Sequence, residues 1–241
     1  MGVLEWLCAR ACDALVSATP KIAKRFPASK TITVQNFPII TEVLNPAPIP
    51  YFERPQSFAY VGDVGVIASI QGAVEMVRAI DLLRNIPGVQ LDMAGSFSPA
   101  GLADTLQALP GWTSVHYHGQ VSREQIANLL GNTRAGLVTL HATVNYLDSY
   151  PIKMFEYMSV GLPVIASDFP LWRRIIDGVG CGLLVDPLNP KSIEKAMRWI
   201  LDNPVEAEAM GQRGRQTIER IYNWDVEATK IICLYNKLLT S

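Results

Sequence analysis

The sequence predicts an α/β fold, a doubly wound parallel sheet with helices on both faces. Runs rich in β-branched and other apolar residues alternate along the chain with segments of helical periodicity. The strand-like runs are almost continuously apolar, which is typical of parallel strands buried on both faces. Because crossovers between parallel strands are right-handed, such a succession closes into a doubly wound sheet.

The strands are short apolar runs bounded by glycine, proline or polar residues, as in SFAYVG and LPVIAS. The helices are the amphipathic or apolar segments between and after them. We expect strands at 31–36, 57–62, 89–95, 114–119, 135–140, 162–167 and 182–186. We expect helices at 70–85, 101–108, 122–131, 151–160, 169–177, 190–202, 204–221 and 224–239.

The first part of the chain departs from this alternation. Residues 36–56 hold five prolines and are predicted to form a linker. Residues 1–35 before it have the pattern of a helix, a short strand, a helix and a strand, which is too small for a domain. This fragment has the pattern expected at the end of a larger domain.

Composition excludes several classes of partner. The chain has 241 residues, 49% of them hydrophobic, and a formal net charge of −1. A nucleic-acid groove or an anionic membrane as main partner needs a basic surface, so neither is expected. The N-terminus lacks the basic start of a signal peptide, and no run reaches transmembrane length. We expect a cytoplasmic protein and leave open a peripheral attachment to the inner membrane face.

The four cysteines and three histidines do not form a metal set. Cys8 and Cys12 lack a second pair, so free thiols in a reducing compartment are expected. His116 and His118 alternate on one strand face, but no third ligand is apparent. His141 follows a strand, where a functional role and a capping role are equally compatible with the sequence. No metal and no other cofactor are expected.

Glycines follow three of the predicted strands directly. Gly62, Gly95 and Gly119 stand where ligands bind in a doubly wound sheet, beyond the carboxyl ends of the strands. Glycine there permits positive φ and close approach of a ligand to the backbone. One such glycine could simply end a strand, but three together favour a ligand crevice.

The segment SYPIKMFEYMSVGLPVIAS places a cation and an anion on a short apolar helix. Pro151 suits the helix start, so its free N–H groups face the crevice and favour phosphate. Lys153 adds a charge there, and Glu156, on the same face, could accept hydrogen bonds from ribose hydroxyls. Together they describe a nucleotide site. The alternative is an ordinary surface salt bridge between Lys153 and Glu156.

PIKMFEYMSVGLPVIAS resembles the signature of family 4 (group 1) glycosyltransferases, which are retaining enzymes of the GT-B fold with two Rossmann-like domains. YVGDVGVIASI resembles the glycine loop of their donor domain, and VHYHGQVSREQI resembles the strand and loop beside the nucleobase. DALVSATPKIAKRF and ERIYNWDVEATKIICLYNKLL resemble flanking parts of the same fold. The resemblance covers nearly all of residues 13–239 and implies a donor-binding, C-terminal half.

The resemblance implies a role for each matching position. Glu156 would hold the ribose as the second acid of an E-x7-E motif, and Asp148 would stand in place of the first, near the donor sugar. These two are the implied catalytic residues. The implied donor-nucleotide-binding residues are Gly62, Asp63, Gly95, Gly119, Gln120, Val121, Ile152, Lys153 and Glu156.

Two cations that many members carry in the glycine loop are missing. Asp63 follows the glycine where an Arg is common, Ala68 stands at the later cationic position, and Ser69 replaces the glycine after it. Losing such a clamp on the departing diphosphate typically costs about 10²–10³ in rate. We expect Lys153 and the helix N-terminus to compensate in part.

The resemblance also divides the chain. Residues 1–40 would be a remnant of the acceptor domain, 41–56 a linker, 57–222 the donor domain, and 223–241 a helix returning toward the N-terminal part. The expected function is the nucleotide-sugar-binding domain of a retaining glycosyltransferase, truncated or split, which transfers a hexose-type sugar and is inactive when isolated.

The alternatives are an inactive GT-B-like binding or interaction domain and a nucleotide-sugar epimerase. The expected ligands are a nucleotide sugar and a glycan or lipid-linked acceptor. A homo-oligomer and a separate acceptor-domain partner both stay open, as does peripheral membrane association.

Overall fold

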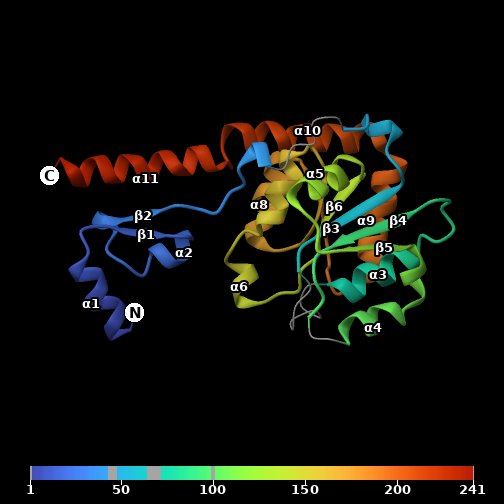
Figure 1. Ribbon diagram of the computed structural model, residues 1–241, viewed down its shortest axis with the longest axis horizontal. Coiled ribbons are helices and arrows are strands. Elements are labelled where there is room, and N and C mark those ends of the chain that lie inside the picture. Colours follow the sequence, from blue (N-terminus) through green and yellow to red (C-terminus); the bar gives the residue numbers. More distant parts are fainter. Residues whose placement is uncertain (1, 43–47, 64–71, 99–100, 241) are drawn as a thin grey trace.

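The computed structural model describes residues 2–42, 48–63, 72–98 and 101–240. Its main body is a six-stranded parallel sheet with the strand order β5-β4-β3-β6-β7-β8 (Figure 1). Counted along the chain from β3, this is the 3-2-1-4-5-6 order of a dinucleotide-binding sheet, so the predicted fold class is confirmed. The strands are β3 (Ser57–Val61), β4 (Gln90–Ala94), β5 (Val115–Gly119), β6 (Ala135–Val138), β7 (Val164–Ser167) and β8 (Gly182–Val185).

Two layers of helices cover the sheet, each with its own buried cluster. One cluster joins Phe58 and Leu91 of the sheet to Met76 and Met197 of the first layer, and the other joins Val61 to the second layer. The first layer holds α3 (Ala73–Asp81), α4 (Leu102–Gln107) and α9 (Pro190–Asp202). The second holds α5 (Arg123–Gly131), α7 (Ile152–Ser159), α8 (Pro170–Val179) and α10 (Pro204–Arg220).

The N-terminal part forms a small separate unit beside the main body (Figure 1). Its two strands, β1 (Leu15–Ser17) and β2 (Thr31–Thr33), pair in parallel, and α1 (Val3–Ala11) and α2 (Pro20–Ala23) flank them. The last helix, α11 (Trp224–Leu239), extends from α10 back over this unit. The Gln35 N–H donates to the Glu227 carboxylate at 3.0 Å, which ties the end of the unit to α11.

The segment expected to be a linker is partly packed against the main body. It contains short 3-10 turns at Ile40–Glu42 and Tyr51–Glu53. Tyr51 is buried, and its hydroxyl donates to the Arg134 carbonyl at 2.8 Å. A further short helix, α6 (Val144–Leu147), lies in a loop for which the sequence predicted no helix.

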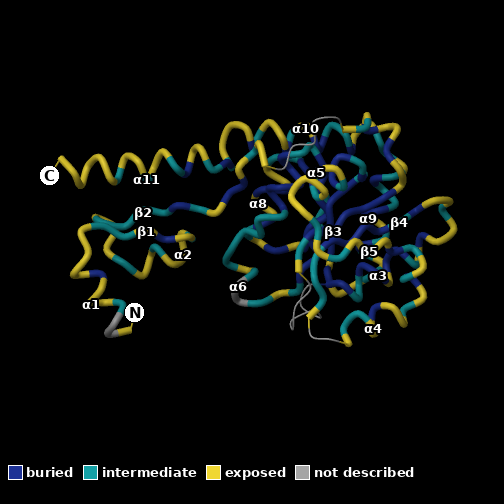
Figure 2. Tube along the Cα trace, viewed as in Figure 1, coloured by how far each residue is buried: buried dark blue, intermediate teal, exposed yellow. Residues whose placement is uncertain are grey.

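Much of the N-terminal unit and most of α11 is exposed (Figure 2). Several of the exposed residues there are large and apolar. None of the helices in the described part of the chain has the length and apolar character needed to span a bilayer. The exposed apolar residues of these two parts include Trp6, Leu7, Val16, Ile232, Tyr235 and Leu239.

Candidate functional site

Three glycine loops lie side by side at the carboxyl edge of the sheet. The Gly62 N–H donates to the Ala94 carbonyl and the Gly95 N–H to the Gly119 carbonyl, both at 2.8 Å. All three glycines have positive φ, and a Cβ on Gly95 would lie 2.3 Å from the Gly62 carbonyl oxygen. The loops therefore pack backbone to backbone next to the β3–β6 switch point, where doubly wound sheets bind ligands.

Lys153 projects from the first turn of α7 into the space that Gly62 leaves open. Its ammonium lies 4.0 Å from the centroid of the Tyr60 ring, a cation–π contact. A Cβ on Gly62 would lie only 2.6 Å from the Lys153 Nζ. Since α7 begins at this edge, its free N–H groups and the ammonium lie on the same side of the crevice.

The ammonium of Lys153 is held largely away from water. Desolvation lowers its pKa to about 8, against the opposing attraction of Glu156 and Asp63. Within the described residues, no carboxylate lies within ion-pair distance of it. The residue as a whole keeps partial exposure. Burying a cation costs free energy unless an anion compensates its charge. Because a ligand can still reach Lys153, its ammonium is well suited to bind an anion.

Glu156 lies one turn further along α7 and is 6% exposed. Its carboxylate accepts a hydrogen bond from Arg123 Nη1 of α5 at 2.7 Å. The alternative of a surface Lys153–Glu156 salt bridge is therefore wrong, because the acid is buried and its partner comes from another helix. A buried carboxylate with one cationic partner still has lone pairs free for hydroxyl donors.

Glu156 lines a cavity of about 320 Å³ between α7, α5 and the segment that leads out of β2. Ile152, predicted to approach the diphosphate, lines the same cavity. The volume lies at the lower end of the range for small-molecule sites. The other lining residues are Asn36, Phe37, Pro38, Ile39, Glu42, Arg123 and Trp224.

Asp148 lines a different cavity, of about 600 Å³, between the main body and the N-terminal unit. Its carboxylate forms an ion pair with Lys21 of α2. Asn36 and Phe37 line this cavity as well as that of Glu156, so the two hollows are neighbours. The structure thus places the two acids of the expected motif in adjoining hollows.

Asp63 connects two of the glycine loops. Its carboxylate accepts from the Ser96 N–H at 2.8 Å and from the Ser96 hydroxyl at 2.7 Å. The Ser96 hydrogen bonds lower the pKa of Asp63, so it is anionic near the Lys153 ammonium. The expectations for Ala68 and Ser69 lie outside the described residues.

The remaining predicted positions are the last residue of β5 and the two residues after it. Gly119 has a φ of 65° and no neighbour within 4 Å of an added Cβ, so its loop is open to a ligand. Gln120 is exposed. Val121 does not line the Glu156 cavity and instead borders another cavity under α5, beside Asp92.

Sequence reasoning missed several side chains that shape the site. Besides Arg123 and Lys21, it missed Tyr157, whose buried hydroxyl accepts the Val61 N–H at 2.8 Å and so fixes the backbone just before Gly62. The Tyr157 ring packs directly against Gly136, and a Cβ on Gly136 would lie 2.1 Å from a carbon of that ring. Glycine at this position therefore makes room for Tyr157. Contacts between distant segments leave no signal in a single sequence.

His141 reaches Glu75 of α3 at 3.1 Å, which gives it a polar partner at the end of β6. Asp92 lies between His116 and His118, a neighbour that the sequence did not reveal. In the part of the chain that the structure describes, no group of three or more His, Cys, Asp or Glu residues is arranged to hold a metal ion.

This site is set in a chain whose residues 52–217 match the family model described as Glycosyl transferases group 1. That range covers more than half of the sequence. The chain belongs to the group 1 glycosyltransferases.

Curated relatives in this family include mannosyltransferases. The chain is 23% identical over 172 residues to MMP alpha-(1->4)-mannosyltransferase of Mycolicibacterium hassiacum, covering 70% of this chain and 41% of the relative. It is 28% identical over 167 residues to phosphatidyl-myo-inositol mannosyltransferase of Mycobacterium tuberculosis, covering 66% and 42%. The chain thus spans about two fifths of the length of these relatives.

Solved structures confirm that the fold is the C-terminal half of a GT-B fold. Sucrose-phosphate synthase from Thermosynechococcus elongatus matches with a TM-score of 0.74 at 21% identity, covering 98% of this chain and 61% of that one. HepE of Anabaena, solved in complex with UDP, matches with a TM-score of 0.75 at 14% identity, covering 96% and 65%. At these identities the likeness establishes the fold.

Proposed function

We propose that this glycosyltransferase chain binds the nucleoside-diphosphate sugar donor of a retaining enzyme that transfers a hexose-type sugar. The observation that carries the proposal is the arrangement of Gly62, Lys153 and Glu156. Three groups lie at the switch point of the sheet: an ammonium that has no ion-pair partner among the described residues, a glycine that leaves room for it, and a buried carboxylate one turn away. A diphosphate would face the positive Lys153, and the ribose next to it would face the negative Glu156.

Each group then has a chemical task. Lys153 and the N-terminal N–H groups of α7 bind the diphosphate, and the Glu156 carboxylate accepts hydrogen bonds from the ribose hydroxyls. The base lies along Gly119 and Gln120, whereas Val121 borders the cavity under α5. Arg123 orients the Glu156 carboxylate through their 2.7 Å hydrogen bond.

In the proposed reaction, an acceptor hydroxyl attacks the anomeric carbon on the face from which the nucleoside diphosphate leaves. The bond from that carbon to the diphosphate oxygen breaks, the bond to the acceptor oxygen forms, and the hydroxyl proton passes to the departing phosphate. Lys153 and the α7 N-terminus offset the negative charge that develops on the leaving group. No protein nucleophile and no metal ion enters this scheme.

The acceptor side of the proposal rests on the cavity of about 600 Å³ next to Asp148. Asp148 is proposed to contact hydroxyls of the donor sugar. Lys24 and Arg174 also line this cavity, and within the described residues neither forms an ion pair. Two such cations suit an acceptor that carries phosphate, as a lipid-linked glycan does. Two relatives are named for phosphatidyl-myo-inositol and D-inositol 3-phosphate, and a cytoplasmic protein at the membrane surface would meet acceptors of this kind.

Asp63 favours one alternative, a GT-B domain that binds a nucleotide but has lost its chemistry. Its anionic carboxylate, fixed by Ser96, adds negative charge beside the proposed diphosphate position. Lys153 is the group that opposes this charge. Diphosphate binding without any sugar transfer in the presence of acceptors would identify this alternative.

Calorimetric titration tests the proposed donor site directly. Wild type should bind one of UDP, GDP or ADP more tightly than its 2′,3′-dideoxy analogue. Removing the Glu156 carboxylate forfeits charge-assisted hydrogen bonds worth roughly 1.5–3 kcal/mol each, so Glu156→Ala should abolish that preference. Glu219→Ala is the matched control, because Glu219 pairs with Arg215 on the surface. If wild type itself shows no preference for the ribose form, the assignment of Glu156 is wrong.

A further inference from the structure

A further polar cavity lies under α5, distinct from the cavities that Glu156 and Asp148 line. Its volume is about 330 Å³, and it opens on the face of β4 and β5 opposite α4. Most of its lining side chains are amides or hydroxyls, together with one carboxylate and one imidazole. The lining residues are Pro55, Ser57, Gln90, Asp92, His118, Val121, Gln125, Asn128, Leu129, Asn132 and Thr133.

The polar floor of this cavity breaks the pattern of the sheet. Parallel strands in a doubly wound fold are apolar on both faces, and on the other face Leu91 and Met93 of β4 are buried. On this face the inner strand β4 presents the buried Asp92 instead, next to the exposed His116 and His118 of the edge strand β5. Departures of this kind from local rules concentrate at functional sites.

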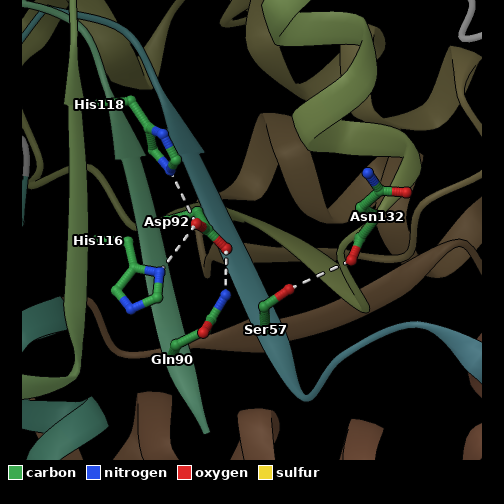
Figure 3. A network of polar contacts seen from close by, with 6 residues as sticks. All are labelled: Ser57, Gln90, Asp92, His116, His118 and Asn132. Carbon is green, nitrogen blue, oxygen red and sulfur yellow. Dashed lines mark hydrogen bonds and ion pairs between the residues drawn. The ribbon is translucent and has the colours of Figure 1, made fainter. Parts of the chain in front are cut away.

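Asp92 is the centre of the network that forms the floor (Figure 3). It is 6% exposed, and one carboxylate oxygen lies 2.8 Å from His118 Nε2. The other oxygen accepts from Gln90 Nε2 at 3.3 Å, and His116 Nδ1 lies 3.9 Å from the first. A buried carboxylate with only neutral or weakly basic neighbours offers strong acceptor sites to hydroxyl donors.

The chemistry of the lining selects the class of ligand. No Lys or Arg is among the described residues that line the cavity, and Asp92 repels anions, so neither a phosphate nor a nucleotide suits it. Amide side chains such as Gln125 and Asn128 both donate and accept, as the hydroxyl groups of a sugar do. Pro55 and Leu129 supply apolar surface for the C–H groups of a sugar ring.

We propose that this cavity binds a neutral carbohydrate, at a site separate from the donor crevice. Asp92 would accept from adjacent sugar hydroxyls, while Asn128 and Gln125 hold the other edge of the ring. Such a site would keep a glycan bound to the chain independently of the nucleotide. The proposal stands whether or not Lys153 and Glu156 bind a nucleotide.

Chemical-shift titration of the full chain with D-mannose and D-glucose, and with glycerol as a non-cyclic polyol, tests the proposal. One of the two sugars should shift the His118 ring and Asn128 side-chain signals saturably, and glycerol should not. Asp92→Asn removes charge-assisted acceptor bonds and should weaken the affinity at least about tenfold. Asn128→Ala should weaken it several-fold, while Asn236→Ala, an exposed asparagine on α11, should change nothing.

Asn128 is exposed, so its replacement leaves the fold intact even if Asp92→Asn disturbs the network. UDP, GDP and ADP titrated against the same variants report on the α7 crevice separately, and their binding should be unchanged. Absence of saturable shifts with both sugars at high millimolar concentration would overturn the proposal. So would equal sugar affinity in wild type and Asn128→Ala.

Discussion

Replacing Lys153 by Met should remove the cation that the proposed diphosphate needs and leave its apolar stem in place. A hydrogen bond from an ammonium to a phosphate oxygen contributes roughly 1.5–3 kcal/mol, which is about 10–100-fold in affinity. Lys153→Met should therefore weaken binding of a nucleoside diphosphate by that factor. Binding of the plain nucleoside should stay the same, because the ribose and base contacts lie elsewhere.

The low pKa of Lys153 makes the same interaction depend on pH. With a pKa of about 8, the ammonium is about 90% protonated at pH 7 and about 10% protonated at pH 9. If only the charged form holds the diphosphate, affinity falls about tenfold over this interval. Asp63 and Glu156 face the same ammonium, and both raise its pKa. Calorimetry at pH 7, 8 and 9 measures this change, and binding near pH 8–9 should take up a proton.

The free energy of unfolding tests the lowered pKa of Lys153 independently of ligand binding. The folded-state pKa of Lys153 lies below the usual value of about 10.4, so burying the charge destabilises the fold below pH 8, and the penalty fades between pH 8 and 10.4. Lys153→Met removes this penalty but also loses the contact with Tyr60, and partial exposure reduces the penalty. The substitution should therefore raise the free energy of unfolding at pH 7 by about 1–2 kcal/mol. An equal effect of the substitution on diphosphate and nucleoside, or an unchanged pH dependence in the variant, would refute the role of Lys153.

Three further predictions concern the loops and surfaces around the site. Tyr157→Phe leaves the buried Val61 N–H without its acceptor and should destabilise the chain by about 1–3 kcal/mol in denaturant unfolding, whereas no loss would show that the bond is dispensable. Ala68→Arg should tighten diphosphate but not nucleoside binding, less so at high salt, and equal effects on both ligands would remove this loop from the diphosphate site. The exposed apolar side chains of the N-terminal unit and α11 should drive association with a second copy or a partner, and light scattering that finds a strict monomer at high concentration would contradict this.

Periodicity and glycine placement predicted the main body because both are local properties. Apolar runs and helical segments alternate from residue 57 onward, and strands β3 to β8 lie where those runs stand. The crossover rule then leaves few topologies for such an alternation. The short helix α6 was missed because a single turn within a polar loop carries no detectable period.

The partners of the candidate site residues could not be predicted in this way. The sequence placed Lys153 and Glu156 on one helix face, but the ion pair from Arg123 to Glu156 depends on how α5 packs against α7. The contact of Lys21 with Asp148 likewise joins segments that only the tertiary fold brings together. Secondary-structure propensity predicts individual helices and strands, whereas these ion pairs depend on how the helices pack against one another.

The most direct test of the central claim is amide chemical-shift mapping of the full chain with UDP, GDP and ADP. At least one of them should bind saturably and shift Gly62, Gly95 and the first turn of α7 most strongly. Signals from Lys153 and Glu156 should move together, because diphosphate and ribose belong to one ligand. Absence of saturable shifts with all three nucleotides, or shifts confined to surfaces away from the β3–β6 switch point, would contradict the account.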